Sequence, residues 1–286
     1  MAAFTGRLRV HGCVFSPDGS LLATNDVDTT RLRHIVTGRQ HVLIGHTGRV
    51  NRCAFSADGA LLATAGNDST ARLWLVADGS QRAILAGHTG WVNSCSFAPD
   101  GTLVATGGSD CTVRLWRVAD GRQRAVLTGH TGRVKHCAFS PDGVLLATAS
   151  SDRTARLWGV SDGTTRAVLA GHGDLLNDCT FSPDGTLLAT TSDDRTVRLW
   201  RVSDGTERAV LSGHASWVDK CEFSPDGTLL ATASNDGTVR LWRIADARCQ
   251  CALRFAGPVV GIAWHPNTTT LCTVGGAGMY MLTYQP

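Results

Sequence analysis

The sequence predicts an all-β protein built as a ring of small, four-stranded antiparallel sheets, and three observations support this prediction. Gly-His pairs recur every 42 residues, at 45–46, 87–88, 129–130, 171–172 and 213–214. Each period contains four short strand-like runs separated by turns, and the chain has 32 glycines, as a protein with many tight turns needs. One such sheet cannot cover both of its faces alone, so neighbouring units must stack, and radial stacking closes them into a ring.

The unit after Gly129 shows the pattern that predicts the four strands. Its runs are "VKHCAF" (134–139), "LLATAS" (145–150), "TARLWGV" (154–160) and "TRAVL" (165–169). Between the first two runs lies the turn "SPDG", in which Pro presets φ, Asp bonds the backbone and Gly takes a positive φ. Each "SPDG" turn is therefore expected to close a hairpin.

The two ends of the chain are degenerate copies of the same unit. "HGCVFSPDGSLLATNDVDTTRLRHIV" from His11 aligns with the regular unit, with His34 in the place of Trp158 and no Gly-His pair. At the other end "VVGIAWHPNTTTLCTVGGAGMYMLTYQP" keeps three strands, with Phe255 where the His is expected. We therefore expect one domain, residues 1–286, with five well-formed repeats over about 45–254 and degenerate units over about 6–44 and 255–286.

The last unit ends before its fourth strand. The segment from Ala2 to Thr5 precedes the first strand of the first unit, where the fourth strand of the preceding unit would lie. We predict that this segment pairs with the last sheet, closes the ring and removes an exposed sheet edge.

Six of the ten cysteines occupy one repeated position, at 13, 53, 95, 137, 179 and 221. Successive units lie about one sheet spacing, roughly 10 Å, apart, which is too far for disulfides. We interpret these cysteines as small buried hydrophobic residues in a reducing compartment. Cys249 and Cys251 have no partner pair at zinc spacing, which favours a solvated turn over a metal site.

Charge and hydropathy exclude few partners. The net charge of +3 is too small to indicate nucleic-acid or membrane binding. No apolar run reaches the length of a signal peptide or membrane span, so the chain is expected to be soluble and cytoplasmic. We also expect the isolated domain to be monomeric. We expect no cofactor and no metal.

Gly-His, "SPDG", Asp and "LW" at these spacings resemble the WD40 repeat family over practically the whole chain. The resemblance implies a seven-bladed WD40 β-propeller with four antiparallel strands per blade. The Trp-Asp typical of the family is here Trp74-Leu75, Trp116-Arg117 or Trp158-Gly159, for example. The Trp is kept, so the predicted fold is unaffected.

His130, Thr148 and Asp152 are residue types found in hydrolytic triads, but the same set recurs in five units. A catalytic site needs one activated nucleophile, and five equivalent ones make no mechanistic sense. In the family these positions form a structural hydrogen-bond tetrad with the Trp. The resemblance implies five tetrads: His46, Thr64, Asp68, Trp74; His88, Thr106, Asp110, Trp116; His130, Thr148, Asp152, Trp158; His172, Thr190, Asp194, Trp200; and His214, Thr232, Asp236, Trp242.

Residues that differ between units are candidates for partner binding. They follow Gly-His or flank the turn Asp, and both turns are expected on one face opposite "SPDG", which we call the top face. Trp and Arg are enriched at binding hot spots. Packing of Trp91 and Trp217 over adjacent loops is the alternative interpretation. The candidates are Arg49, Trp91, Arg133, Lys135, His136, Arg153, Leu175, Arg195, Trp217 and Lys220.

The leading hypothesis is a non-catalytic scaffold or sensor that binds a protein or peptide on the top face. The near-identical repeats resemble bacterial WD40 arrays of NTPase or kinase signalling proteins, although the sequence contains no P-loop or kinase motif. The alternative is a central channel that binds a small molecule or sugar, or acts as an enzyme. It needs carboxylates or histidines on the innermost strands, where we expect Cys, Ala, Val and Phe. Nucleic acid is a weaker third candidate, because acidic residues interrupt the basic ones.

Overall fold

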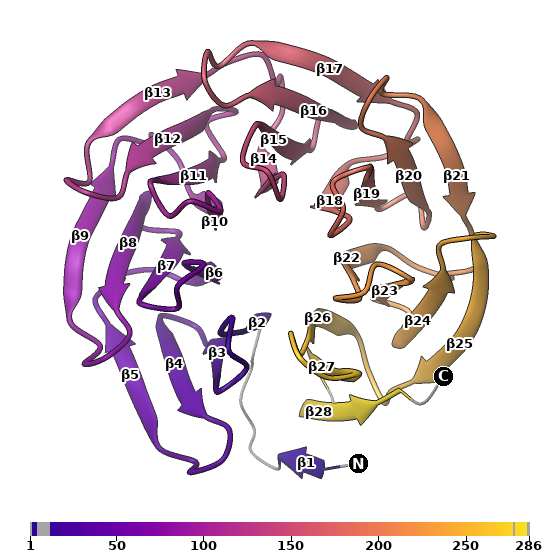
Figure 1. Ribbon diagram of the computed structural model, residues 1–286, viewed down its shortest axis with the longest axis horizontal. Coiled ribbons are helices and arrows are strands. Elements are labelled where there is room, and N and C mark those ends of the chain that lie inside the picture. The colour runs from indigo at the N-terminus through magenta and orange to yellow at the C-terminus, as the bar shows by residue number, and fades with distance from the viewer. Residues whose placement is uncertain (1, 5–11, 277, 285–286) are drawn as a thin grey trace.

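The computed structural model describes residues 2–4, 12–276 and 278–284. Seven four-stranded antiparallel sheets surround a common axis as a seven-bladed β-propeller (Figure 1). No helix occurs within the described residues. The predicted all-β ring is therefore confirmed.

Each of the first six blades consists of four consecutive strands, the first innermost and the fourth on the rim (Figure 1). Blades 1 to 3 contain β2 (Gly12–Phe15), β3 (Leu21–Asn25), β4 (Thr29–His34), β5 (Gln40–Ile44); β6 (Val50–Phe55), β7 (Leu61–Gly66), β8 (Thr70–Leu75), β9 (Gln81–Ala86); and β10 (Val92–Phe97), β11 (Leu103–Gly108), β12 (Val113–Arg117), β13 (Gln123–Leu127). Blades 4 to 6 contain β14 (Val134–Phe139), β15 (Leu145–Ser150), β16 (Thr154–Gly159), β17 (Thr165–Ala170); β18 (Leu176–Phe181), β19 (Leu187–Ser192), β20 (Val197–Arg201), β21 (Glu207–Leu211); and β22 (Val218–Phe223), β23 (Leu229–Ser234), β24 (Thr238–Arg243), β25 (Arg248–Arg254).

Blade 7 combines both ends of the chain. It contains β26 (Val259–Trp264), β27 (Thr270–Gly275), β28 (Gly278–Thr283) and, on its rim, β1 (Ala2–Phe4). β1 pairs antiparallel with β28, with Ala3 opposite Tyr280. The predicted closure is confirmed for residues 2–4, whereas Thr5 and the start of the first unit, up to His11, lie outside the described residues.

The turns have the backbone conformation that their sequence predicts. In the "SPDG" turn of blade 4 Gly143 has a φ of 71°, and its N–H donates to the carbonyl of Ser140. The Ser140 hydroxyl donates to Asp142 and accepts from the N–H of Leu145. These bonds close the hairpin between β14 and β15.

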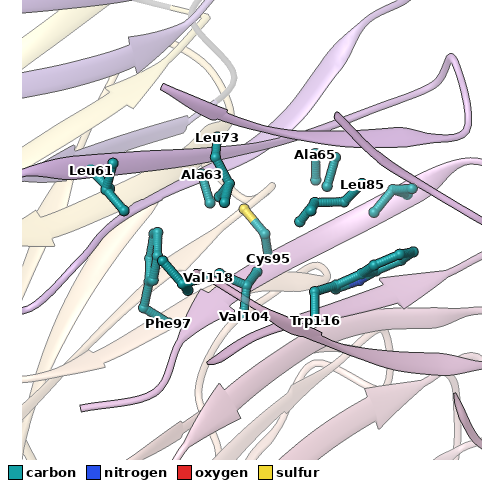
Figure 2. Packing of buried hydrophobic residues seen from close by; sticks show 12 residues of the cluster. Leu61, Ala63, Ala65, Leu73, Leu85, Cys95, Phe97, Val104, Trp116 and Val118 are labelled. Carbon is teal, nitrogen blue, oxygen red and sulfur yellow. The ribbon is translucent and has the colours of Figure 1, made fainter. Parts of the chain in front are cut away.

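The core lies between blades, as stacked sheets require. In Figure 2, Leu73 and Leu85 of blade 2 lie near Cys95 and Trp116 of blade 3. Complete burial of one leucine side chain contributes about 1.5–3 kcal/mol. The repeated cysteine is part of this packing: it is buried in blades 2 to 6 and half-buried at Cys13.

The strand register corrects one alignment in the first unit. Trp158 lies opposite Leu146, twelve residues earlier, whereas the equivalent Leu22 lies opposite Arg33, eleven residues later. Arg33, and not His34, therefore occupies the Trp position, because the connection between β3 and β4 is one residue shorter. His34 instead accepts backbone N–H groups from Val36 and Thr37 in the next turn.

The cysteine pair near the C-terminus also differs from expectation. Cys249 and Cys251 lie on the rim strand β25 and not in a solvated turn. Cys249 is exposed and Cys251 half-buried, and all ten cysteines of the chain are free.

Candidate interaction face and central channel

The structure brings each of the five predicted tetrads together. In blade 4 the indole N–H of Trp158 donates to the Thr148 hydroxyl at 2.9 Å, and that hydroxyl lies 2.7 Å from His130 Nε2. His130 Nδ1 lies 2.7 Å from the Asp152 carboxylate. The Asp152 carboxylate can only accept, so Nδ1 carries the proton that is donated to it, and Nε2 of the neutral ring accepts from the Thr148 hydroxyl. The other four tetrads have the same contacts.

Burial and hydrogen bonding set the charges of the tetrad. Burial lowers the pKa of His130, although the neighbouring Asp152 acts in the opposite direction. The lowered pKa keeps the imidazole neutral. Burial alone would raise the pKa of Asp152, but hydrogen bonds from Thr154, His130 and the N–H of Thr131 hold it below its usual value. The Thr148 side chain is fully buried. A substrate therefore cannot reach this hydroxyl. The network instead has a structural role: it connects the loop before β14 and the turn after β15 to the sheet.

Backbone hydrogen bonds join the two variable turns on the top face in blades 2 to 6. The N–H of Ser109 donates to the carbonyl of Trp91, and the N–H of Asn235 donates to that of Trp217. Both tryptophans are exposed, at 50% and 52% of their surface. The Arg133 guanidinium lies 5.8 Å from the Trp91 ring centre, so one neighbouring loop contacts this indole while half of its surface stays accessible.

The structure divides the ten candidate residues into two groups. Six are exposed on the top face, and two are half-buried: Leu175, directly before β18, and Lys135, near the start of β14. The exposed residues are Arg49, Trp91, Arg133, Arg153, Arg195 and Trp217. His136 and Lys220 do not lie on the loop surface: they are on the innermost strands β14 and β22 and line the central channel. Their placement among the loop residues is therefore wrong, because they lie inside the strands and not before them.

The central channel contains charged side chains, which corrects the expectation of Cys, Ala, Val and Phe. Arg52 on β6 reaches across the ring to Asp178 on β18, with Nη2 3.0 Å from Oδ1. His136 Nδ1 lies 2.7 Å and Lys220 Nζ 3.7 Å from the same oxygen. Asp178 Oδ2 accepts the backbone N–H of Cys221 at 3.1 Å. One buried carboxylate, 2% exposed, is thus shared by three basic side chains.

The buried charges perturb one another. Burial alone would raise the pKa of Asp178, but His136 and Arg52 hold it below its usual value. Burial and the charge of Arg52 lower the pKa of His136 despite the neighbouring carboxylate. Burial raises the pKa of Glu222, on the channel wall, to about 8, so this carboxyl is mainly protonated near neutral pH. Closer to the mouth, burial and the nearby Asp193 raise the pKa of Asp219 to about 7.

Sequence reasoning missed Arg52, Asp178 and Glu222 as channel residues, although a signal was present. The first two stand at the position that carries Ser94 in blade 3, and this position varies in charge from blade to blade. Glu222 stands where blades 2 and 4 have Ala54 and Ala138. Alternation along a strand places such residues on the wall of the ring, but only the closed ring brings opposite blades within hydrogen-bond distance.

Other kinds of site find no support in the part of the chain that the structure describes. Over these residues no group of three or more His, Cys, Asp or Glu side chains is arranged to hold a metal ion. No helix among them is long and apolar enough to cross a membrane.

Comparison with known families agrees with the geometry. The family described as WD domain, G-beta repeat (WD40) matches five segments that cover more than half of the chain: residues 38–74, 79–117, 121–159, 163–201 and 205–243. Each segment contains one complete tetrad. No curated protein matches the sequence. The chain therefore belongs to the WD40 repeat family.

Proposed function

We propose that this protein is a non-catalytic interaction scaffold or sensor that binds a protein or peptide on its top face. WD40 propellers commonly mediate protein interactions. The observation that carries the proposal is the pair of half-exposed tryptophans at loop tips, Trp91 and Trp217, on blades 3 and 6. An indole exposed to this extent keeps about half of its surface available to a partner.

The surroundings of the two indoles suggest how a partner is oriented. Arg49 is exposed on blade 2 and Arg133 and Arg153 are exposed on blade 4, whereas blade 5 exposes both Asp174 and Arg195. Charges at the rim of an interface mainly steer association and select orientation, while buried aromatic residues supply affinity. We infer that the tryptophans anchor the partner and that the arginines orient it.

The test is capture of a partner by immobilised wild-type protein and by the double variant Trp91→Ala, Trp217→Ala. We expect the partner to be captured by the wild type and lost, by at least about tenfold in affinity, from the double variant. The melting temperature should remain unchanged. Val144→Ala is the matched control, because Val144 is also exposed but follows the "SPDG" turn on the opposite face. Equal capture by the double variant would contradict the proposal.

We also propose a cytoplasmic location and a monomeric state for the isolated domain. The ten free cysteines support a reducing compartment, because an exposed thiol such as that of Cys249 becomes oxidised in an oxidising compartment. The resemblance of the near-identical repeats to those of NTPase and kinase signalling proteins supports a sensor role. A nucleic-acid partner would instead show binding that falls steeply with salt.

A further inference from the structure

A cavity of about 330 Å³ lies on the ring axis and is lined by residues from the innermost strands of all seven blades. This volume is within the range of small-molecule sites. Four successive residues of β6, Asn51 to Ala54, line its wall, so the cavity extends along the strand and not only across its mouth.

Two cations in this cavity occupy a position that elsewhere has a structural task. At the equivalent positions Ser94 and Asp178 accept the backbone N–H of the cysteine in the next blade, each at 3.1 Å. Arginine and lysine side chains have no acceptor atom. Arg52 and Lys220 therefore cannot make this inter-blade bond, and their side chains extend into the cavity.

Both cations of the cavity wall have donors that no side chain of the described residues accepts. A guanidinium has five N–H donors, but in the described part of the chain Arg52 makes one side-chain hydrogen bond, to Asp178. Lys220 Nζ lies 3.7 Å from the same carboxylate, which is too far for a hydrogen bond. Asn25 also lines the cavity, and its side-chain amide interacts with the weakly accepting Cys53 thiol.

The charges leave one cation without a counter-charge. Asp178 balances either Arg52 or Lys220, but not both. Glu222 does not supply the second negative charge because burial raises its pKa to about 8. Taking an uncompensated cation out of water is unfavourable. A structural ion pair across the ring needs only one cation. The stability of the fold therefore does not explain why the second cation is present.

We propose that the central cavity binds a compact anionic group, a carboxylate or a phosphate, between Arg52 and Lys220. The group enters either as a free small anion or as the acidic side chain of a partner segment seated on the top face. In both cases its oxygens accept from the unused donors of Arg52 and from Lys220, and Asp178 is the competing anion that is already present.

The test is calorimetric titration of the full chain with sodium phosphate, trisodium citrate and a short glutamate-rich peptide, at constant ionic strength set with sodium chloride. We expect saturable binding by wild type, weakened at least about tenfold by Lys220→Met. Asp178→Asn removes the competing anion and should tighten binding by about tenfold, whereas a purely structural role of Asp178 predicts no gain. Arg49→Met, a cation outside the cavity, is the control and should bind like wild type.

The source of the anion and the fate of the proposal follow from the same titrations. Binding of phosphate or citrate identifies a free small anion as sufficient, and binding of the peptide alone identifies an acidic partner segment. Absence of binding by all three probes, or unchanged affinity in both Lys220→Met and Asp178→Asn, would overturn the proposal. The double tryptophan variant should bind phosphate or citrate normally, so failure of top-face partner binding remains distinguishable.

Discussion

At the scale of single residues, one position of the innermost strand differs in charge from blade to blade within the channel. Ser94, Asp178 and His136 contact the neighbouring blade there, whereas Arg52 and Lys220 extend into the channel. In contrast, the residues of the tetrads and of the "SPDG" turns repeat almost unchanged in the five regular blades. Individual chemistry is therefore concentrated where the seven strands face a common space.

Glu222, two residues after Lys220 on β22, has a measurable consequence for stability. Its pKa of about 8 in the folded protein lies above the ordinary value of 4.5, so folding favours its protonated form. The wild type then loses stability as the pH rises from about 5 to about 8, because the unfolded chain ionises this carboxyl while the folded protein keeps it protonated in the channel wall. Glu222→Gln lacks this loss. We expect the variant to gain roughly 1–3 kcal/mol in unfolding free energy relative to wild type over this range, measured by urea denaturation.

A matched control exists for this measurement. Glu207→Gln replaces a carboxylate on the rim strand β21, where blades 2 and 3 carry Gln81 and Gln123 bonded to the equivalent arginines. Its stability difference from wild type should not grow between pH 5 and 8. Parallel pH profiles for wild type and Glu222→Gln would show that Glu222 ionises normally.

At the scale of elements, the tetrad explains why a loop and two strands keep the same geometry in five blades. Trp158 on β16 bonds to Thr148 on β15, and His130 before β14 bonds to Asp152 in the turn after β15. Blade 7 lacks the set, and there the Phe255 ring lies 5.3 Å from that of Tyr280. The five polar networks thus accompany the five regular repeats.

Removal of one member tests the network. His130→Ala leaves the Thr148 hydroxyl and the Asp152 carboxylate without their buried partner, so we expect a loss of about 1–3 kcal/mol in unfolding free energy. His41→Ala, on the exposed part of β5, should change stability by less than about 0.5 kcal/mol. Partner or anion binding of the folded fraction should persist. A melting temperature of His130→Ala equal to that of wild type would contradict the proposed stabilising role.

The positions of the elements could be predicted well because each has a local cause. The "SPDG" turn, the alternation along each strand and the 42-residue period were readable without any long-range information. The register of β4 could not be predicted in this way. Because the connection before β4 is one residue shorter, Arg33 and not His34 occupies the Trp position. Such a shift is decided by pairing with β3, and a degenerate unit has no Trp to mark the register.

At the scale of the whole molecule, ring closure depends on three residues from the opposite end of the chain. β1 pairs with β28 through Ala2, Ala3 and Phe4. Without β1 the rim of blade 7 is an unpaired edge, which is a site for local opening and aggregation.

Deletion of residues 1–6 tests the closure. We expect the melting temperature to fall by at least about 4 °C, because the backbone pairing of β1 with β28 is lost and blade 7 opens first. Removal of residues 285 and 286 is the control for shortening an end and should leave the melting temperature unchanged. If deletion of residues 1–6 has no effect on melting or chromatographic behaviour, β1 contributes nothing to closure.

The sequence by itself determined the blade: its four strands, its turns and the number of its copies, while the resemblance to the WD40 family implied the tetrad. These follow from local conformational preferences and from a period that repeats the same solution, and they also predicted the terminal strand pairing. Only the tertiary structure decided the chemistry of the centre. Arg52 and Asp178 are 126 residues apart and meet because seven blades enclose a common axis, and no local pattern encodes contacts across that axis.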